Sequence, residues 1–260
     1  MSSHINTLSR LSRSRWISPA VLLLLWELAS RVGLIPDQML AAPSAVLTTL
    51  FRMTASGELP ANLLVSATRA GIGLAIGVSS GIALALLAGL SRFGEAMVDP
   101  LVQIKRTIPV VALSPLFIVW FGIGETPKIA LIAFATIFPV YLNLYNGIRA
   151  VDVRLLDAAR SFSLGQRELI VHVILPGALP SLLVGLRYSL SIAVIMLVIA
   201  EQINASSGLG YLVNNARDFM RTDIIVVCLI IYAMLGLGGD FIVRLVERRA
   251  LSWRPSLVEA

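Results

Sequence analysis

The side chains of this chain that could take part in chemistry are concentrated in one segment, which ends at His172. Charged or titratable residues lie there at eight positions: Arg149, Asp152, Arg154, Asp157, Arg160, Arg167, Glu168 and His172. The lipid core of a membrane does not tolerate such a density of charge, yet the sequence on both sides is almost continuously apolar. We therefore expect residues 149–176 to form a helical loop on one face of a membrane, where its polar groups can contact a partner protein.

The remaining reactive side chains do not form a catalytic or metal-binding pattern. The single cysteine, Cys228, lies in an apolar run, which favours a small hydrophobic residue inside a helix. The two histidines, His4 and His172, are far apart. The sequence has no Gly-x-x-x-x-Gly-Lys-Ser/Thr loop for ATP phosphates, no His-Glu-x-x-His pair and no Gly-x-Ser-x-Gly turn. We expect neither enzyme activity nor a bound cofactor, so a nucleotide could act only through another chain.

Composition indicates a multi-pass membrane protein. Apolar residues make up 57% of the 260 residues and charged residues 14%, and the mean hydropathy is +0.85, far from the balance of a soluble domain. We predict an all-α bundle of about six transmembrane helices, which together form a transmembrane domain over 17–243. The expected spans are 17–35, 62–90, 99–121, 127–148, 178–200 and 224–243. Short tails, 1–16 and 244–260, flank this domain.

Basic residues predict the orientation of the spans. Fourteen of the 21 Lys and Arg residues are assigned to one side of the membrane: 12 lie before the first span, between spans two and three, between spans four and five, or after the sixth, and the other two are Lys105 and Arg106, near the start of the third span. By the positive-inside rule, both termini and residues 149–176 are cytoplasmic. The excess of positive charge is thus a signal of topology, and it is no evidence for a nucleic-acid partner.

Small residues mark one face of the second span. They recur at every fourth position, at Gly73, Gly77, Gly81, Ala85 and Gly89, and such a stripe lets another helix backbone approach closely. The stripe indicates either a helix at the centre of the bundle or at a subunit interface, or ordinary close packing.

The third span is unusually short. Its uncharged stretch, 107–121, contains Pro109 and Pro115, so we expect kinks. Lys105 and Arg106 precede this stretch, and we expect their long side chains to reach the cytoplasmic headgroups.

Polar residues within the spans suggest a path for a solute. The candidates are Arg187, Ser191, Asn143 and Pro115. Arg187 either faces an aqueous path used by an anion or pairs with a carboxylate of a neighbouring helix, and the second interpretation is favoured. The same alternatives apply to Arg69 near the outer face, whereas Glu201 is expected to cap or anchor an external loop.

Two external segments could form a docking surface. Residues 36–61 include a predicted short helix that begins at Pro43, and residues 201–222 include a Ser-Ser-Gly-Leu-Gly turn. Together they offer a modest surface for a soluble protein, although solvated loops are the simpler alternative.

Several runs of residues resemble one family, the integral-membrane permease subunits of bacterial ABC importers. The resemblance covers nearly the whole chain, and the run from Asp157 through Gly165 to Pro176 is similar to the cytoplasmic "EAA" loop of that family. The other matching runs are 114–116, 120–125, 175–180 and 208–211. Within the family, 172–181 and 204–211 look closest to the aliphatic-sulfonate permeases, in a branch that also serves taurine, nitrate and bicarbonate.

The resemblance implies a type I importer fold, a place in the bacterial inner membrane and a set of partners. These are two copies of an ATP-binding subunit, an extracytoplasmic binding protein that contacts 36–61 and 201–222, and a second permease chain in a homodimer. The residues that the resemblance assigns to contact with the ATPase are Asp157, Ala158, Ala159, Arg160, Ser163, Gly165 and Pro176. Asp157 replaces the usual Glu, and Ser163 replaces the usual Gly, so the turn after this helix could be displaced toward Gly165.

Two other classes of membrane protein remain as alternatives. A secondary transporter would need charged relays inside the membrane and inverted repeats, and neither is evident. A membrane-embedded enzyme would need a cluster of His, Asp, Glu or Cys within the spans, which the sequence lacks.

Overall fold

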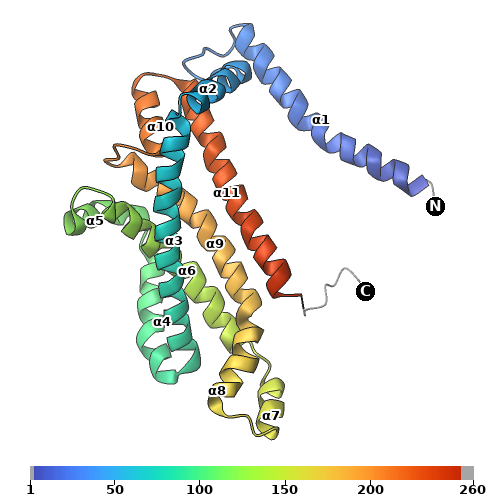
Figure 1. The fold of residues 1–260 in the computed structure, drawn as a ribbon, viewed down its shortest axis with the longest axis vertical. Coiled ribbons are helices and arrows are strands. Elements are labelled where there is room, and N and C mark those ends of the chain that lie inside the picture. Colours follow the sequence, from blue (N-terminus) through green and yellow to red (C-terminus); the bar gives the residue numbers. More distant parts are fainter. Residues whose placement is uncertain (1–2, 253–260) are drawn as a thin grey trace.

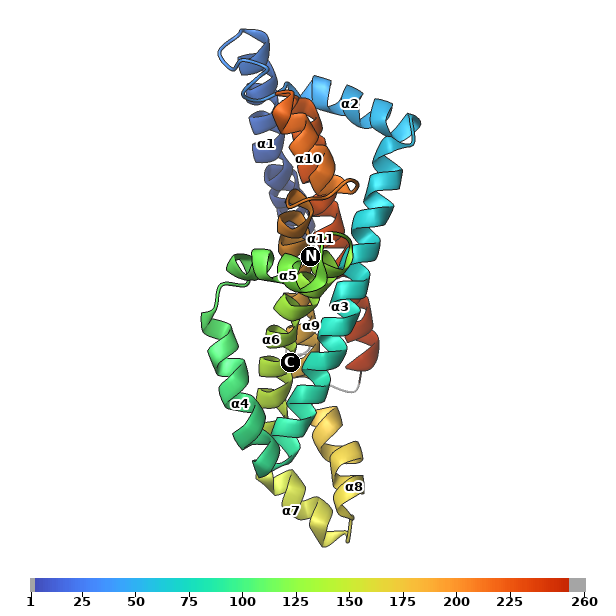
Figure 2. The same cartoon turned by 90° about the vertical axis from the view of Figure 1, so that its left-hand side faces the viewer.

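The computed structural model describes residues 3–252, and for residues 3–16 it describes only the helical backbone. The chain is an elongated bundle of helices (Figures 1 and 2). The helices are α1 Ser3–Arg31, α2 Pro43–Ala55, α3 Glu58–Leu90, α4 Arg92–Thr107, η1 Val110–Leu113, α5 Ser114–Phe121, α6 Thr126–Arg149, α7 Val153–Ser161, α8 Gln166–Leu169, η2 Ile170–Ile174, α9 Leu175–Gln202, α10 Leu209–Asp218 and α11 Thr222–Ala250.

Four helical segments of the described chain are long and apolar enough to cross a membrane. They are α3, α6, the continuous run Gln166–Gln202 that joins α8, η2 and α9, and α11. They coincide with the predicted spans two, four, five and six. The all-α membrane fold is therefore confirmed, and the number of six spans is approximate.

The third predicted span, 99–121, is broken at Pro109, one of the two prolines at which the sequence predicts kinks. It is split into Arg92–Thr107 and Val110–Phe121, which meet at an angle of 92°. Ile108 is extended, with φ −88° and ψ 120°, because a residue before proline is disfavoured in the α conformation. The missing N–H of Pro109 then prevents the helix from resuming its course. Figure 2 shows α4 rising along the bundle and α5 lying across it.

The break also overturns the expected position of Lys105 and Arg106. Both lie in the last turn of α4, roughly 20 Å along the helix from its start at Arg92. Lys105 Nζ lies 4.7 Å from the ring centroid of Phe134, within α6. Lys105 is therefore level with the interior of the α6 span, and it does not reach the end of the bundle that carries α7.

The first predicted span corresponds to α1, which ends at Arg31 instead of residue 35. Gly33, with φ 80°, takes the left-handed conformation that commonly follows the end of a helix. The helix projects away from the bundle, with α2 as its main contact (Figure 1). Glu27, which interrupts the apolar run, accepts hydrogen bonds from the backbone N and the Oγ of Ser44 at 3.0 and 2.8 Å. This polar interruption thus joins α1 to the start of α2.

The small-residue stripe of α3 packs against α6 within the same chain. A Cβ on Gly73 would lie 2.7 Å from Ile132, and one on Gly77 would lie 1.9 Å from Thr136 Oγ1. The most extensive helix contacts of the described chain are those of α6 with α3 on one side and with α9 on the other. Three helices, α3, α6 and α9, therefore form the centre of the bundle.

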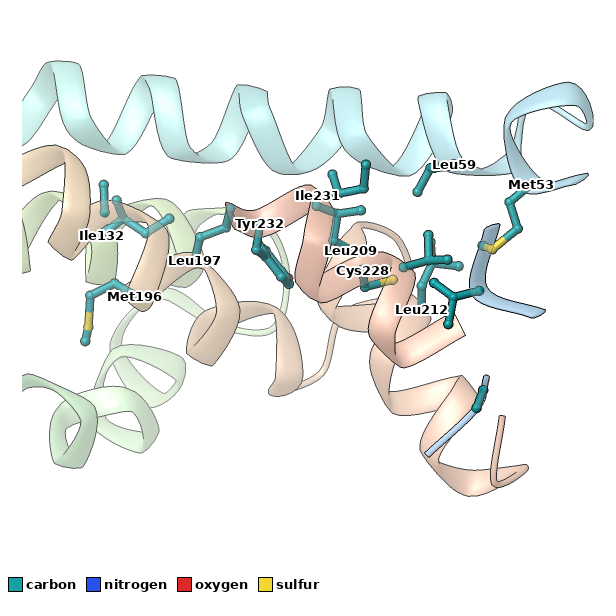
Figure 3. Packing of buried hydrophobic residues seen from close by; sticks show 14 of the residues in the cluster. Met53, Leu59, Ile132, Met196, Leu197, Leu209, Leu212, Cys228, Ile231 and Tyr232 are labelled. Atoms are coloured by element: carbon teal, nitrogen blue, oxygen red, sulfur yellow. The ribbon is translucent and has the colours of Figure 1, made fainter. Parts of the chain in front are cut away.

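A cluster of buried side chains lies toward the end of the bundle that carries α2 and α10, which we call the outer end, in contrast to the inner end that carries α7 (Figure 3). It joins α2, α3, α6, α9, α10 and α11, and it includes Met53, Leu59, Leu197, Leu212 and Tyr232. Cys228 is fully buried in this cluster, so its predicted role as a small hydrophobic residue is confirmed. Helical backbone extends into both predicted tails: α1 begins at Ser3, and α11 continues to Ala250. Residues 253–260 lie outside the described residues.

Candidate functional site

The charged segment 149–176 forms the end of the molecule opposite α2 and α10 (Figures 1 and 2). The helix α7 begins where the carboxylate of Asp152 accepts a hydrogen bond from Arg154 N at 2.8 Å, which satisfies one of the free N–H groups of the first turn. Asp157 and Arg160 form an exposed ion pair of 3.2 Å. The helix therefore presents polar groups of both signs, as the sequence predicts.

The two alanines of α7 face opposite environments. Ala158 is exposed, whereas Ala159 is only 8% exposed and is buried against the chain itself. Of the two, only Ala158 is therefore open to contact from outside the chain, whereas Ala159 packs within it.

Apolar residues on the same helix and its turn escaped sequence reasoning. Val153, Leu155 and Phe162 are all exposed, with Phe162 81% exposed. Exposed apolar side chains among charged ones are typical of a surface that another protein covers. The high overall hydropathy of the chain concealed this signal, because apolar residues are unremarkable in a membrane protein.

The turn after α7 is built at Ser163 and is not displaced toward Gly165. Ser163 has φ 59°, the left-handed conformation that favours glycine. Gly165 has an ordinary φ of −68°, and its N–H donates to Glu168 Oε2 at 2.8 Å. Ser163 thus takes the conformation of the glycine that it replaces.

The segment returns to the bundle through a continuous helical connection. After α8, residues Ile170–Ile174 form one π-helical turn, and Pro176 lies in the first turn of α9. Further on, a Cβ on Gly147 of α6 would lie 2.6 Å from Ser181 of α9. This close packing of α6 on α9 means that a displacement of α7 is passed to two central helices together.

The four candidates for a solute path do not converge. Arg187 pairs with two carboxylates of α11, Asp240 at 3.0 Å and Glu247 at 2.7 Å, in agreement with the interpretation favoured from sequence. Ser191 Oγ and Asn143 Nδ2 donate to carbonyls of their own helices, at 3.4 and 2.8 Å. Pro115 is exposed at the start of α5. The positive charge of Arg187 is therefore already balanced.

A buried polar cluster ties the outer ends of the helices together. Glu201, at the end of α9, has no exposed surface and accepts hydrogen bonds from Arg69 Nη1 at 2.7 Å and Ser66 Oγ at 2.7 Å. It also accepts from Gly210 N at 2.9 Å and from the Tyr232 hydroxyl at 3.2 Å. Glu201 therefore anchors the loop that leads to α10, as the sequence indicates.

Arg69 connects this cluster to a second carboxylate. Its guanidinium pairs with Glu125, in the loop between α5 and α6, as well as with Glu201. Lys128 Nζ lies 3.1 Å from Glu125 Oε1. The hydrogen bond from Arg69 lowers the pKa of the Glu125 carboxyl to about 2. Two cations thus balance two carboxylates. Sequence reasoning did not identify Glu125 and Lys128 as partners, because they lie far from Arg69 in the chain.

Glycine is required where the outer loop meets this cluster. Gly208 has φ 107°, and a Cβ there would lie 2.4 Å from Glu201 Oε1 and 2.6 Å from Arg69 Nη1. Only a residue without a side chain lets the loop close over the ion pair.

The two external segments meet at this end of the molecule. Thr49 Oγ1 donates to Asp223 at 2.7 Å, and Thr222 Oγ1 donates to the carbonyl of Asp37 at 2.5 Å. The helix α2 begins at Pro43 as predicted, and the second segment contains the helix α10, which the sequence analysis did not predict. Residues 36–61 and 201–222 therefore form adjoining surfaces.

Comparison with known proteins agrees with this arrangement. Residues 77–252 match the family model of binding-protein-dependent transport system inner membrane components. The chain is 46% identical to a putative aliphatic sulfonates transport permease protein, SsuC, of Escherichia coli strain K12, over 93% of this chain and 92% of that protein. It is 34% identical to the taurine transport system permease protein TauC of the same strain, over 90% and 87% of the two chains.

A solved structure shows the same fold. One chain of an amino acid ABC transporter crystallised with histidines superposes with a TM-score of 0.63, covering 77% of this chain and 97% of that chain, at 20% sequence identity. The chain therefore belongs to the family of inner-membrane components of binding-protein-dependent transport systems, and it is the permease subunit of an ABC importer, a transport protein and not an enzyme.

Proposed function

We propose that this permease carries aliphatic sulfonates across the membrane. The observation that supports this substrate is the 46% identity to a permease named for aliphatic sulfonates, over nearly the full length of both chains. The taurine permease shares 34% identity over a similar length, so taurine is the competing substrate. Nitrate and bicarbonate, which the resemblance also allowed, have no comparable support.

In the same proposal, α7 transmits force from a separate ATP-binding subunit. The helix protrudes from the bundle, and its exposed groups include an ion pair, the small Ala158 and the apolar Phe162. These are the features of a helix that fits a groove on another protein. Two copies of the ATP-binding subunit would bind two copies of the permease, so ATP belongs to the partner chains.

The opposite end of the molecule is the proposed docking surface for an extracytoplasmic binding protein. The adjoining segments 36–61 and 201–222 lie there, at the far end of the bundle from α7 (Figure 2). With α7 in the cytoplasm, the C-terminal end of α11 is on the cytoplasmic side as well, because α11 runs from the outer end toward the inner end (Figure 1). The basic residues before the first span favour the same side for the N-terminus.

Uptake by the reconstituted complex tests the substrate. Proteoliposomes that contain the permease, its ATP-binding subunit and its binding protein should accumulate labelled ethanesulfonate when ATP is supplied on the side of the membrane that carries the ATP-binding subunit. Taurine at the same concentration should be a poorer substrate. Accumulation of taurine in preference to ethanesulfonate would indicate taurine as the substrate instead. Accumulation of either compound without the ATP-binding subunit would contradict the ABC mechanism.

A pair of identical substitutions tests the coupling role of α7. Ala158→Arg places a long charged side chain on the proposed contact surface, whereas Ala96→Arg places one on an exposed position near the start of α4. We expect Ala158→Arg to lose ATP-driven uptake and co-purification of the ATP-binding subunit, and Ala96→Arg to retain both. Equal behaviour of the two variants would exclude α7 as the coupling element.

A further inference from the structure

The break between α4 and α5 opens a cavity toward the middle of the bundle. Its volume is about 270 Å³, and it lies between the end of α4, η1, α6 and α9. Lys105 and Arg106 line it together with apolar side chains that include Phe138, Ile192, Ile195 and Met196. The cavity therefore combines two cations with an apolar wall.

Lys105 differs from the other cations that lie at depth in this chain. Arg69, Lys128 and Arg187 each pair with a carboxylate within 3.1 Å. No carboxylate of the described residues lies within ion-pairing distance of Lys105, whose Nζ instead lies over the rings of Phe134 and Phe138, 4.7 and 5.8 Å from their centroids. A charge at this depth is costly, and contacts with aromatic rings offset only part of the cost.

This arrangement has the chemistry of a receptor for a small amphiphilic anion. An ammonium group supplies three donors and a full charge to an oxyanion, and the apolar wall accommodates a short alkyl chain. The volume of about 270 Å³ leaves room for a short chain. A carboxylate partner for a substrate ammonium group is absent from the cavity lining that the structure describes.

We propose that this cavity is a binding station on the translocation path, where Lys105, assisted by Arg106, binds the sulfonate group and the α6–α9 wall binds the alkyl chain. The inference rests on the proposed transport of aliphatic sulfonates and adds a site within the permease. It also assigns a selectivity: because the cavity offers nothing to an ammonium group, alkanesulfonates are preferred over taurine at this point of the path.

If Lys105 only stabilised the fold, its replacement would have different effects from those expected for a binding site. Basic side chains in the last turn of a helix stabilise its carbonyl end, and loss of that interaction would lower stability and affect every substrate alike. The test therefore combines transport with stability and uses a cation from the same helix as its control.

The experiment measures uptake of labelled ethanesulfonate by the complete complex in proteoliposomes. We expect Lys105→Met to reduce the rate at least tenfold, with unchanged thermal stability and unchanged ethanesulfonate affinity of the binding protein. Lys105→Arg should retain more than a third of the rate, and Arg92→Met, at the exposed start of α4, should stay within twofold of the original protein. The proposed site would be refuted if Lys105→Met took up ethanesulfonate at the original rate, or if its loss of uptake were matched by a loss of thermal stability.

A second variant tests the apolar wall independently. Ile195→Trp reduces the room in the cavity, so uptake of butanesulfonate should fall at least fivefold more than uptake of methanesulfonate. Equal effects on both would reject the wall as a contact for the alkyl chain. Failure of the unaltered complex to transport any alkanesulfonate would instead refute the proposed function, so the two failures are distinguishable.

Discussion

The close approach of α3 to α6 makes Gly77→Ala the most informative packing variant. A Cβ at this position would lie 1.9 Å from Thr136 Oγ1 and 2.5 Å from the carbonyl oxygen of Ala133, where ordinary contact begins at 3.4 Å. The Thr136 hydroxyl can move by rotation of its side chain, but the carbonyl belongs to the backbone of α6. The two helices must therefore separate by about 0.9 Å, which is the difference between 3.4 and 2.5 Å.

Overpacking of this kind costs roughly 1–3 kcal/mol. Replacement of glycine by alanine in a helix also contributes up to about 1 kcal/mol in the favourable direction, so the net change for Gly77→Ala is smaller than the packing cost. Gly71→Ala isolates that cost. Gly71 lies on the same helix, and a Cβ added there would have no atom of a neighbouring residue within 4 Å, so this variant has the helical gain without the clash.

The assay is denaturant unfolding of the two purified variants in the same detergent. We expect Gly77→Ala to unfold with a free energy about 1–3 kcal/mol lower than that of Gly71→Ala. Thr136→Ala, added to Gly77→Ala, should restore only part of the difference, because the contact with the Ala133 carbonyl remains. Free energies within about 0.5 kcal/mol of each other would refute the assignment of α3 and α6 as a tightly packed pair.

Three further predictions concern the ends of the bundle. Glu201→Ala should lower the free energy of unfolding by about 3–5 kcal/mol, because it removes one partner of the buried ion pair with Arg69. Glu201→Gln also removes the charge but can still form hydrogen bonds, so it should cost less; equal losses in denaturant unfolding would argue against a contribution from the hydrogen bonds of Glu201. Ser163→Gly should raise the thermal midpoint, because relief of a left-handed non-glycine residue contributes about 1 kcal/mol; an unchanged or lower midpoint would contradict strain at the turn. The pKa of Glu125, about 2, is below its ordinary value of 4.5, so the stabilising ion pairs of Glu125 are complete above pH 4.5 and are lost as the pH falls toward 2. Glu125→Gln should therefore abolish this part of the loss of stability in acid. An acid unfolding profile identical to that of the original protein would exclude a contribution from Glu125.

The long spans could be predicted from the sequence because hydropathy and length suffice to define them. The path of the chain between α3 and α6 could not. Hydropathy does not reveal the direction in which the chain runs. It therefore predicts one kinked span for the stretch that contains Pro109, and this span would place Lys105 at the headgroups. The Ile108-Pro109 step is the sequence signal for a break, but it does not predict the angle of 92° between the two segments.

The inner and outer ends of the molecule differ in how far they can be predicted. The segment around Asp157 stands out because charge is rare elsewhere in the chain. The outer cluster involves few residues in many separate elements, and Arg69 bonds to Ser207, which is 138 positions away. Sequence reasoning can state that a buried arginine needs a carboxylate. It cannot select Glu125 and Glu201 as the partners, because only the folded arrangement brings them together.

The cluster around Glu201 has a mechanical consequence for transport. Because it fastens α3, α9, α10 and α11 at one extremity, these helices cannot spread apart there, and a push delivered at α7 must tilt them as one block about that fastening. In the proposed homodimer, with α7 on the cytoplasmic side, the widest excursion then occurs at the cytoplasmic extremity of each block, and the outward mouth of the conduit forms along the seam between the two blocks.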